Sequence, residues 1–374
     1  MALSERLKQP TAKESEYRPK TEFDGQSGYI QTGPLESEPS SHSELLSFFG
    51  YNKPGDDPVR IVGTPRVSKW QTYDERWLSS YRFTIEPVHD SRVDDLFALI
   101  KRHKAHKPVG VGSSAFNFQA GDLQLGKADE GGSGGIVDRY LESVDAAKAK
   151  LKTLRRFGSV GPVNLMFPGD CIEGNQAQNG RNMWRTDMTI TEQVRVFRRL
   201  LMHTVSEFAP LTDELFVRVV NGNHDEVQRF QATRPDDGHA TEAAIAVSDA
   251  IALNADAYGH VTVEVPPLDQ GYMTVAAGDT IFTIAHGHQW RRNGAMSWWS
   301  GHAFNGGNPG AAHILAHGHW HAWEVQTTGN RTRICGATFE GASKWFEENT
   351  GGTAAKGALV YTTAAGAVSD LSLV

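Results

Sequence analysis

The stretch VNLMFPGDCIEGN, residues 163–175, sets the pattern of this chain. An apolar run of strand-forming residues stops at Gly169, and Asp170 follows as a polar tip. That order is typical of a β-strand that ends in a sharp turn. Four more runs end in the same way, namely FNFQAGDLQ (116–124), LFVRVVNGNHDE (215–226), TIFTIAHGH (280–288) and HILAHGHWH (313–321).

The side chains at these five tips are of the kinds that bind divalent metals. Carboxylate, amide and imidazole groups delivered by separate strand ends suit hard or borderline divalent ions. Asp170 is the candidate for a bridging ligand, because a carboxylate has two oxygens and the flanking glycines allow a sharp turn. The sequence therefore predicts a two-metal site whose candidate ligands are Asp122, Gln124, Asp170, Asn223, His286, His319 and His321, with His224 beside Asn223.

The other histidines carry less weight in this prediction. His288 and His317 flank tip residues, and His317 shares a strand face with His319 and His321 if that segment stays extended. His317 could thus support the ligands from behind. The remaining candidates are expected to be structural, namely His203, His239, His260, His302 and His313.

Length and composition are those of a soluble globular protein. The chain has 374 residues, a net charge of -7, 39% hydrophobic residues and 22% charged residues. No apolar run reaches the roughly 20 residues of a membrane span, and the polar start MALSERLKQPTAKE lacks the apolar core of a signal peptide. Cys171 and Cys335 lie far apart, which fits a reducing compartment. We therefore expect a cytoplasmic protein with no membrane partner.

The acidic balance argues against broad, non-specific coating of nucleic acid. One cationic stripe stands out, KAKLKTLRR at 148–156, with five cations in nine residues. It is either a contact for a phosphate backbone or the solvated face of a helix. The sequence leaves both interpretations open.

Composition divides the chain into three parts. Residues 1–42 are rich in Ser, Glu, Lys, Pro and Gly, which predicts a disordered or loosely docked arm. Residues 43–105 predict a small α/β module, with a helix at 43–49, two strands around a Tyr-Asp-Glu turn and a helix at 92–103. From 110 to 374, strands alternate with helices, which favours a layered α/β fold.

Within this larger part, several elements can be placed. GGSGG at 131–135 is expected to be a flexible loop before a helix at 137–157. Thr189 and Glu192 form a capping box for a helix whose apolar stripe packs on the sheet. A third helix is expected at 240–256 and strands at 261–265, 271–278 and 280–287. Trp290 to Gly310 lacks periodicity, and is either a loop over the site or a set of tryptophans that covers an apolar edge.

The ordered motifs resemble those of the calcineurin-like metallophosphoesterase superfamily. They are DLQ at 122–124, GDCIEGN at 169–175, GNHDE at 222–226, HG at 286–287 and GHWH at 318–321. Four of the five match the family pattern well, over roughly Ser113 to Ala322. The resemblance implies two packed β-sheets flanked by helices, with two metals held at the sheet edge.

The same resemblance implies a role for each tip residue. Metal one would be held by Asp122, Gln124, Asp170 and His321, and metal two by Asp170, Asn223, His286 and His319. His224 would contact the phosphate and protonate the leaving oxygen, and Asp225 would orient His224. The mechanism implied is in-line attack by a metal-activated hydroxide.

Gln124 departs from the family pattern, which usually has histidine at this position. An amide oxygen is a weaker and harder donor than imidazole, so a ligating Gln124 predicts loose binding of metal one, with Mn²⁺ or Mg²⁺ favoured over Zn²⁺. Fe²⁺ also fits such a site. The alternative is that Gln124 does not ligate and a water takes its place.

The phrase DLQLGK at 122–127 looks most like that of the Mre11/SbcD-like branch of DNA nucleases. The chain also resembles metallophosphoesterases encoded by actinobacterial phages, which would place it in the host cytoplasm. The preferred hypothesis is a phosphodiesterase acting on DNA, as a homodimer or with a replication or repair partner. The alternatives are a phosphomonoesterase or nucleotide phosphoesterase, and a non-catalytic metal-binding scaffold.

Overall fold

The computed structural model describes residues 18–23, 28–53, 59–87, 100–110, 112–129, 131–158, 160–176, 185–228, 233–341, 351 and 354–374. The chain divides into two compact units, Met1–Arg92 and Val93–Val374. Among the described helices, none combines the length and apolar character that a membrane crossing requires.

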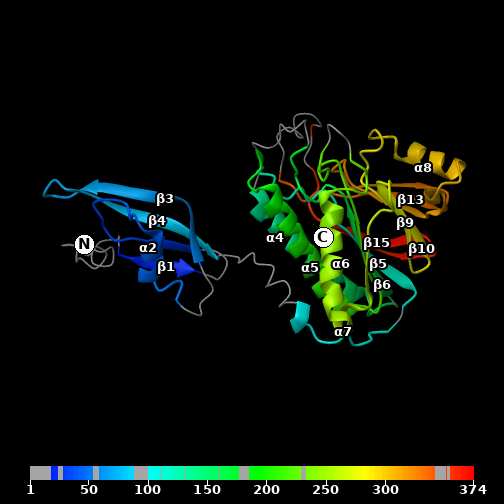
Figure 1. The fold of residues 1–374 in the computed structure, drawn as a ribbon, viewed down its shortest axis with the longest axis horizontal. Helices are drawn as coiled ribbons and strands as arrows, with labels where there is room; N and C mark the ends of the chain where they lie inside the picture. The colour runs from blue at the N-terminus through cyan, green and yellow to red at the C-terminus, as the bar shows by residue number, and fades with distance from the viewer. Residues whose placement is uncertain are drawn as a thin grey trace. The chain divides into compact units, whose positions relative to one another are not determined.

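The first unit is a four-stranded antiparallel sheet covered by one helix (Figure 1). The strands are β1 (Lys20–Phe23), β2 (Gly28–Gln31), β3 (Val59–Gln71) and β4 (Trp77–Pro87), in the order β1-β2-β4-β3. Helix α2 (His42–Phe48) buries Leu45 and Leu46 against Ile30, Phe83 and Ile85. This helix and the β3–β4 hairpin lie where the sequence predicts them.

Strands β1 and β2 lie inside the stretch for which a disordered or loosely docked arm is predicted. Residues 20–23 and 28–31 instead extend the sheet, because β2 pairs with β1 and β4 and places Ile30 in the core. A single buried apolar residue between polar neighbours leaves little periodicity to detect. Residues 1–17 lie outside the described part, as does most of the helix expected at 92–103.

The second unit is a sandwich of two β-sheets, which confirms the predicted fold. The six-stranded sheet has the order β15-β14-β5-β6-β7-β8, and the five-stranded sheet has the order β12-β13-β11-β10-β9. Their apolar faces meet in a shared core that includes Met166, Val220, Phe282, Ile284 and Tyr361. The strands are β5 (Ser114–Gln119), β6 (Val160–Pro168), β7 (Leu215–Val220), β8 (Val261–Glu264), β9 (Tyr272–Ala277), β10 (Thr280–Ala285), β11 (Ile314–His317), β12 (Glu324–Thr328), β13 (Arg331–Cys335), β14 (Leu359–Ala364) and β15 (Ala367–Leu373).

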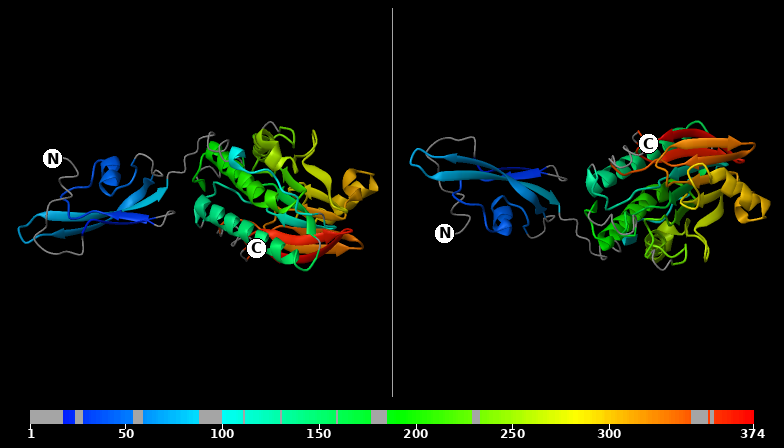
Figure 2. Two further views of the ribbon diagram at one scale, coloured as in Figure 1. Left: turned by 90° about the horizontal axis from the view of Figure 1, so that it is seen from below. Right: turned by 90° about the horizontal axis from the view of Figure 1, so that it is seen from above.

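Helices cover the outer face of the six-stranded sheet (Figure 2). They are α4 (Gly132–Leu154), α5 (Ile190–Phe208), α6 (His239–Ile251) and the short α7 (Ala255–Tyr258), with the 3₁₀ turns η2 (Ala209–Leu211) and η3 (Ala252–Asn254). The capping box that begins α5 is formed as predicted: Thr189 accepts from the backbone of Glu192, and the Glu192 carboxylate accepts from Thr189.

The expectation of a flexible GGSGG loop is wrong, because most of these residues form the first turn of α4. Asp187, far along the chain, accepts from Ser133 N at 2.7 Å and also bonds to the Ser133 hydroxyl. A carboxylate at this position satisfies free N–H groups and the positive end of the helix dipole. A Cβ added to Gly132 would lie 2.6 Å from the Asp187 carboxylate, so the close contact itself requires glycine.

The segment from Trp290 to Gly310 is largely helical, which corrects the expectation of a loop. It contains α8 (Ala295–Phe304) and the 3₁₀ turn η4 (Asn308–Ala311), beside the five-stranded sheet (Figure 1). Trp290 and Trp299 are buried against Ala285 and Leu315, so these two tryptophans cover an apolar edge. Glycines at 294, 301 and 306 obscure the helical period in the sequence.

A buried polar row joins the two sheets behind the strand ends. Arg218 on β7 donates to Asn164 Oδ1 at 2.8 Å and to Glu264 Oε2 at 2.7 Å, and it reaches the carbonyl of Ala276 on β9 at 2.5 Å. Asn164 in turn donates to Asn117 at 2.9 Å. The Arg218 side chain is 1% exposed, so its charge depends on these partners.

We predict that Arg218→Met lowers the free energy of unfolding by about 3 kcal/mol, because Glu264 and Asn164 lose a buried partner. Urea denaturation followed by circular dichroism measures the change. Arg198→Met is the control, since the Arg198–Glu242 pair is half-exposed, and it should cost no more than about 1 kcal/mol. Equal costs for the two variants would contradict the structural role of the row.

Candidate metal centre

The predicted ligands all follow strands at one end of the sandwich. Strands β5, β6 and β7 run parallel, so their carboxyl ends meet at one edge of the six-stranded sheet. Strands β10 and β11 also run parallel and end beside them. The first sheet therefore supplies the oxygen donors Asp122, Gln124, Asp170 and Asn223, and the second sheet supplies the imidazoles His286, His319 and His321.

Left-handed backbone conformations aim these side chains. Ten non-glycine residues in the described part of the chain have positive φ, and half of them are predicted ligands: Asp122, Gln124, Asp170, His319 and His321. Such conformations cost about 1 kcal/mol or more each for an ordinary residue, and they cluster where the surroundings fix a functional geometry. Five of these left-handed residues lie at one edge of the sandwich, which indicates that the backbone there is shaped for a functional site.

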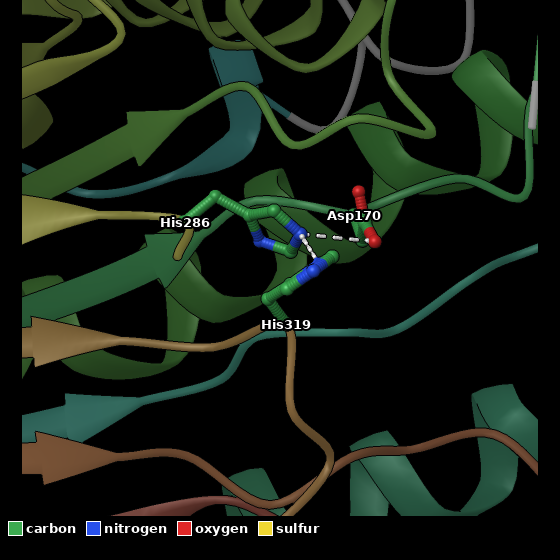
Figure 3. Close-up of side chains that lie close together, drawn as sticks. All are labelled: Asp170, His286 and His319. Carbon is green, nitrogen blue, oxygen red and sulfur yellow. Dashed lines mark hydrogen bonds and ion pairs between the residues drawn. The ribbon is translucent and has the colours of Figure 1, made fainter. Parts of the chain in front are cut away.

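Asp170, His286 and His319 form the tightest group (Figure 3). His286 Nε2 lies 3.0 Å from Asp170 Oδ2 and 3.1 Å from His319 Nδ1. Their potential ligand atoms all lie within 4.8 Å of one another. His286 Nδ1 faces the carbonyl of Pro168 at 2.8 Å and must donate to it, which leaves Nε2 available as a ligand atom. This donor set fits a divalent ion.

The local field favours a cation at this group. Burial by itself lowers the pKa of His286, but the carboxylates of Asp170 and Asp122 outweigh it and raise the pKa to about 9, so in the metal-free chain Nε2 holds a proton that a metal ion would have to displace. Burial and then the charge of His286 lower the pKa of His319 to about 3, which keeps its ring neutral as a ligand must be. Burial alone would raise the pKa of Asp170, yet His286 and His224 bring it well below its usual range.

Close packing around Asp170 fixes the neighbouring tips. Asp170 Oδ1 accepts from the backbone of His224 at 2.8 Å. A Cβ on Gly222 would lie 2.0 Å from that same oxygen, and one on Gly169 would lie 2.6 Å from His286 Nδ1. Both glycines are therefore required by close approach. Asn223 lies between these two contacts in the chain, because Gly222 packs against the Asp170 carboxylate and the backbone of His224 donates to it.

The donors expected for metal one lie beside this group but are more loosely arranged. His321 Nε2 is 3.5 Å from Asp122 Oδ1, and the carboxylate of Asp122 also accepts from the backbone of His319 at 2.8 Å. His321 Nδ1 contacts Glu340 Oε1 at 2.7 Å, and this contact orients the ring. Glu340 is buried and was missed by the sequence analysis.

Gln124 lies with these donors, but its side-chain oxygen already has a partner. Gln124 Oε1 accepts from Lys127 Nζ at 3.0 Å, and the Lys127 ammonium also forms an ion pair with Glu340. Burial lowers the pKa of Lys127, against the opposing pull of Glu173 and Asp129. Neither of the alternatives foreseen for Gln124, ligation or replacement by water, included this contact.

His224 lies beside the group, with its Nε2 3.9 Å from Asp170 Oδ2 and its side chain 15% exposed. Its Nδ1 is 2.9 Å from the carbonyl of Glu173 and 3.3 Å from the Glu173 carboxylate. Burial alone would lower the pKa of His224, but Asp170 and Glu173 raise it to about 10. The ring of His224 therefore holds its proton at neutral pH. The role of proton donor to the leaving oxygen stays a prediction of the sequence.

The expectation that Asp225 orients His224 is wrong. The Asp225 carboxylate accepts from backbone N–H groups of Gly222, Cys171 and Ile172, at 2.7 to 3.2 Å. Burial and the neighbouring Asp170 raise the pKa of Asp225 to about 7. Asp225 thus ties the second tip to the third, and Glu173 takes the part assigned to it at His224.

Three residues of the site were not foreseen as such, and each had a signal in the sequence. Glu173 lies inside GDCIEGN, and Lys127 ends DLQLGK. Glu340 follows β13 in RICGATFE, a sixth apolar run that ends in a polar tip. His317 is excluded from the metal group: it is fully buried, accepts from Arg333 at 2.8 Å and contacts the carbonyl of Gly318.

Comparison with protein-family models gives no match, and no curated protein matches the chain. Among solved structures, Vps29 of Entamoeba histolytica complexed with Zn²⁺ shares 14% identity over 69% of this chain and 98% of that one, with a TM-score of 0.30. An archaeal phosphodiesterase shares 11% identity over 66% and 92%, with a TM-score of 0.30. A predicted phosphoesterase of Streptococcus pneumoniae shares 13% over 44% and 74%, with a TM-score of 0.24. These likenesses are too remote to carry a function, which rests on the site.

We predict that His286→Ala and His319→Ala each weaken Mn²⁺ binding by more than roughly 100-fold, the upper end for residues that only orient ligands. Isothermal titration of the metal-free chain measures the affinity. His203→Ala is the control, because His203 lies on helix α5 away from the tips, and it should leave the affinity unchanged. Unchanged binding in both ligand variants would remove these residues from the metal centre.

Proposed function

We propose that this chain is a divalent-metal-dependent phosphodiesterase that belongs with the calcineurin-like metallophosphoesterases and acts on DNA. The observation that carries the hydrolase is the gathering of Asp170, His286 and His319, with His224 beside them. A bound divalent ion supplies a water of lowered pKa and positive charge for phosphoryl oxygens. The expectation of two ions, most suitably Mn²⁺, stays a prediction of the sequence.

The remaining steps, proton donation and orientation of the donor, fall to His224 and Glu173. His224 donates to a phosphoryl oxygen or to the leaving oxygen, and the contacts of its Nδ1 with Glu173 hold the ring so that Nε2 faces the metal group. Nε2 lies 3.9 Å from Asp170 Oδ2, so a phosphoryl group bound at the metal ligands is within reach. If an ion held by Asp170, His286 and His319 supplied the attacking water, the reaction would need no covalent intermediate on the protein.

DNA as the substrate rests on the DLQLGK phrase alone. The cationic stripe at 148–156 adds no support, because Lys148 pairs with Glu207 and Arg155 donates to Val160 and Leu211 carbonyls. These contacts bind two of the five cations of the stripe within the protein and leave the phosphate-contact interpretation without support. A phosphomonoesterase and a metal-binding scaffold are therefore tested beside the nuclease.

The test measures hydrolysis of bis-p-nitrophenyl phosphate, p-nitrophenyl phosphate and labelled single- and double-stranded DNA. Each reaction is run with Mn²⁺, Mg²⁺, Fe²⁺ or Zn²⁺ and with EDTA. We expect Mn²⁺-dependent cleavage of the diester and of DNA, abolished by EDTA. Cleavage of the monoester alone would make the chain a phosphatase, and no cleavage of any ester would favour the scaffold.

We predict that His224→Ala keeps Mn²⁺ bound but lowers turnover of the diester by roughly two to four orders of magnitude. The affinity is read by titration and the turnover by release of p-nitrophenol. Glu173→Gln should give a smaller loss of turnover, since the backbone carbonyl of residue 173 still holds the ring. If His224→Ala hydrolyses the diester like the parent chain, His224 has no part in the reaction.

A further inference from the structure

A lysine stands among the donors expected to hold metal one. Lys127 follows Gln124 by three residues, and a turn closed by Lys127 N and the carbonyl of Gln124, 3.1 Å apart, folds its side chain back onto the site. The side chain of Lys127 is only 16% exposed. Its ammonium contacts the Gln124 oxygen at 3.0 Å and the carboxylate of Asp129 at 3.6 Å, and pairs with Glu340.

The contact with Gln124 settles which end of the amide points to the lysine. An ammonium only donates hydrogen bonds, so the atom that faces it must be the amide oxygen. That oxygen is the single atom through which glutamine could bind a metal ion. Any ion held there would share the oxygen with an ammonium and would meet its positive charge in a partly buried setting.

Glu340 connects the same ammonium to a second expected ligand. One carboxylate oxygen of Glu340 pairs with Lys127, and the other contacts His321 Nδ1 at 2.7 Å. The opposite nitrogen of His321 faces Asp122 at 3.5 Å. Gln124, His321 and Asp122 are therefore already linked around a fixed positive charge, and that charge offsets the buried carboxylates.

The residue type at 124 suits this arrangement. An amide oxygen has two lone pairs and accepts from an ammonium without taking up a proton itself, whereas an imidazole can be protonated and would then repel the lysine. Glutamine at position 124 thus suits the contact with Lys127. Among the described residues, by contrast, no lysine or arginine forms a hydrogen bond or ion pair with the side chain of Asp170, His286 or His319.

We infer that Lys127 is a resident cation in place of metal one, so that the chain binds one divalent ion tightly, at Asp170, His286 and His319, where the sequence predicts two. The inference concerns the same site as the proposed function and rests on it for the presence of an ion. It does not require that the chain hydrolyse any ester.

The test counts metal ions on the full chain in the absence of substrate. Metal-free protein is dialysed against Mn²⁺, and bound metal is measured by elemental analysis beside electron paramagnetic resonance of the bound Mn²⁺. We expect one ion per chain, with the spectrum of an isolated ion. Lys127→Met should raise the count to two and give the spectrum of a coupled pair, because the ammonium no longer occupies the Gln124 oxygen.

Two further variants serve as a back-up and as a control for Lys127→Met. Lys127→Met leaves the buried carboxylate of Glu340 without its cation, and this variant could fail to fold for that reason. The double variant Lys127→Met/Glu340→Gln removes both charges and serves in that case. Lys148→Met is the matched control, because Lys148 is similarly enclosed, at 19% exposure, and pairs with Glu207 outside the site. It should still bind one ion.

Two tightly bound ions on the parent chain would overturn the inference, as would a count that stays at one in both Lys127 variants. These outcomes are separate from the proposed function. A chain that binds one ion but cleaves no ester keeps the resident cation and loses the phosphodiesterase. If the chain binds two ions and cleaves the diester, the phosphodiesterase proposal stands and the inference of a resident cation is wrong.

Discussion

The buried carboxylate of Asp170 is the constraint on which the rest of the site depends. It is 2% exposed, so its charge must be met by donors and cations from the protein or by a metal ion. Two other tips meet this need. In the tip at 215–226, the backbone of His224 donates to one oxygen and Gly222 packs against the carboxylate too closely for any side chain, and in the tip at 280–288, His286 contacts the other oxygen. The geometry of the metal centre follows from packing around one charge.

The two sheets contribute different kinds of predicted ligand. The six-stranded sheet contributes the oxygen donors, whereas the five-stranded sheet contributes the imidazoles. The site therefore exists only when the two sheets are packed, and the buried row through Arg218 and Asn164 links those sheets. Left-handed backbone at Asp122, Asp170 and His319 then turns the ligands toward one another. Stability of the core is in this way coupled to the geometry at its edge.

Much of this arrangement could be predicted from the sequence, because strand ends marked by glycine and a polar residue are local signals. The capping box at Thr189 is equally local and is confirmed. The failures involve partners distant in sequence or misleading neighbours. GGSGG becomes helical because Asp187 caps it, and no local rule identifies that partner. Asp225 is adjacent to His224 in sequence, yet its carboxylate serves backbone groups instead.

Glu340 and Lys127 show the same limit within the site itself. Each follows a recognisable stretch of sequence, but only the fold shows that the two meet beside Gln124 and His321. A motif comparison treats Gln124 as a substitution for histidine and stops there. In the structure, the Gln124 oxygen accepts from the Lys127 ammonium. The position expected to bind a metal ion thus binds a side-chain cation.

The measurement that tests this account most directly is an anomalous difference map from crystals grown with Mn²⁺ and recorded near the manganese absorption edge. The account predicts a strong peak bounded by Asp170, His286 and His319. The absence of a peak at these three residues, in crystals that bind Mn²⁺ elsewhere, would contradict the metal centre and the hydrolase built on it.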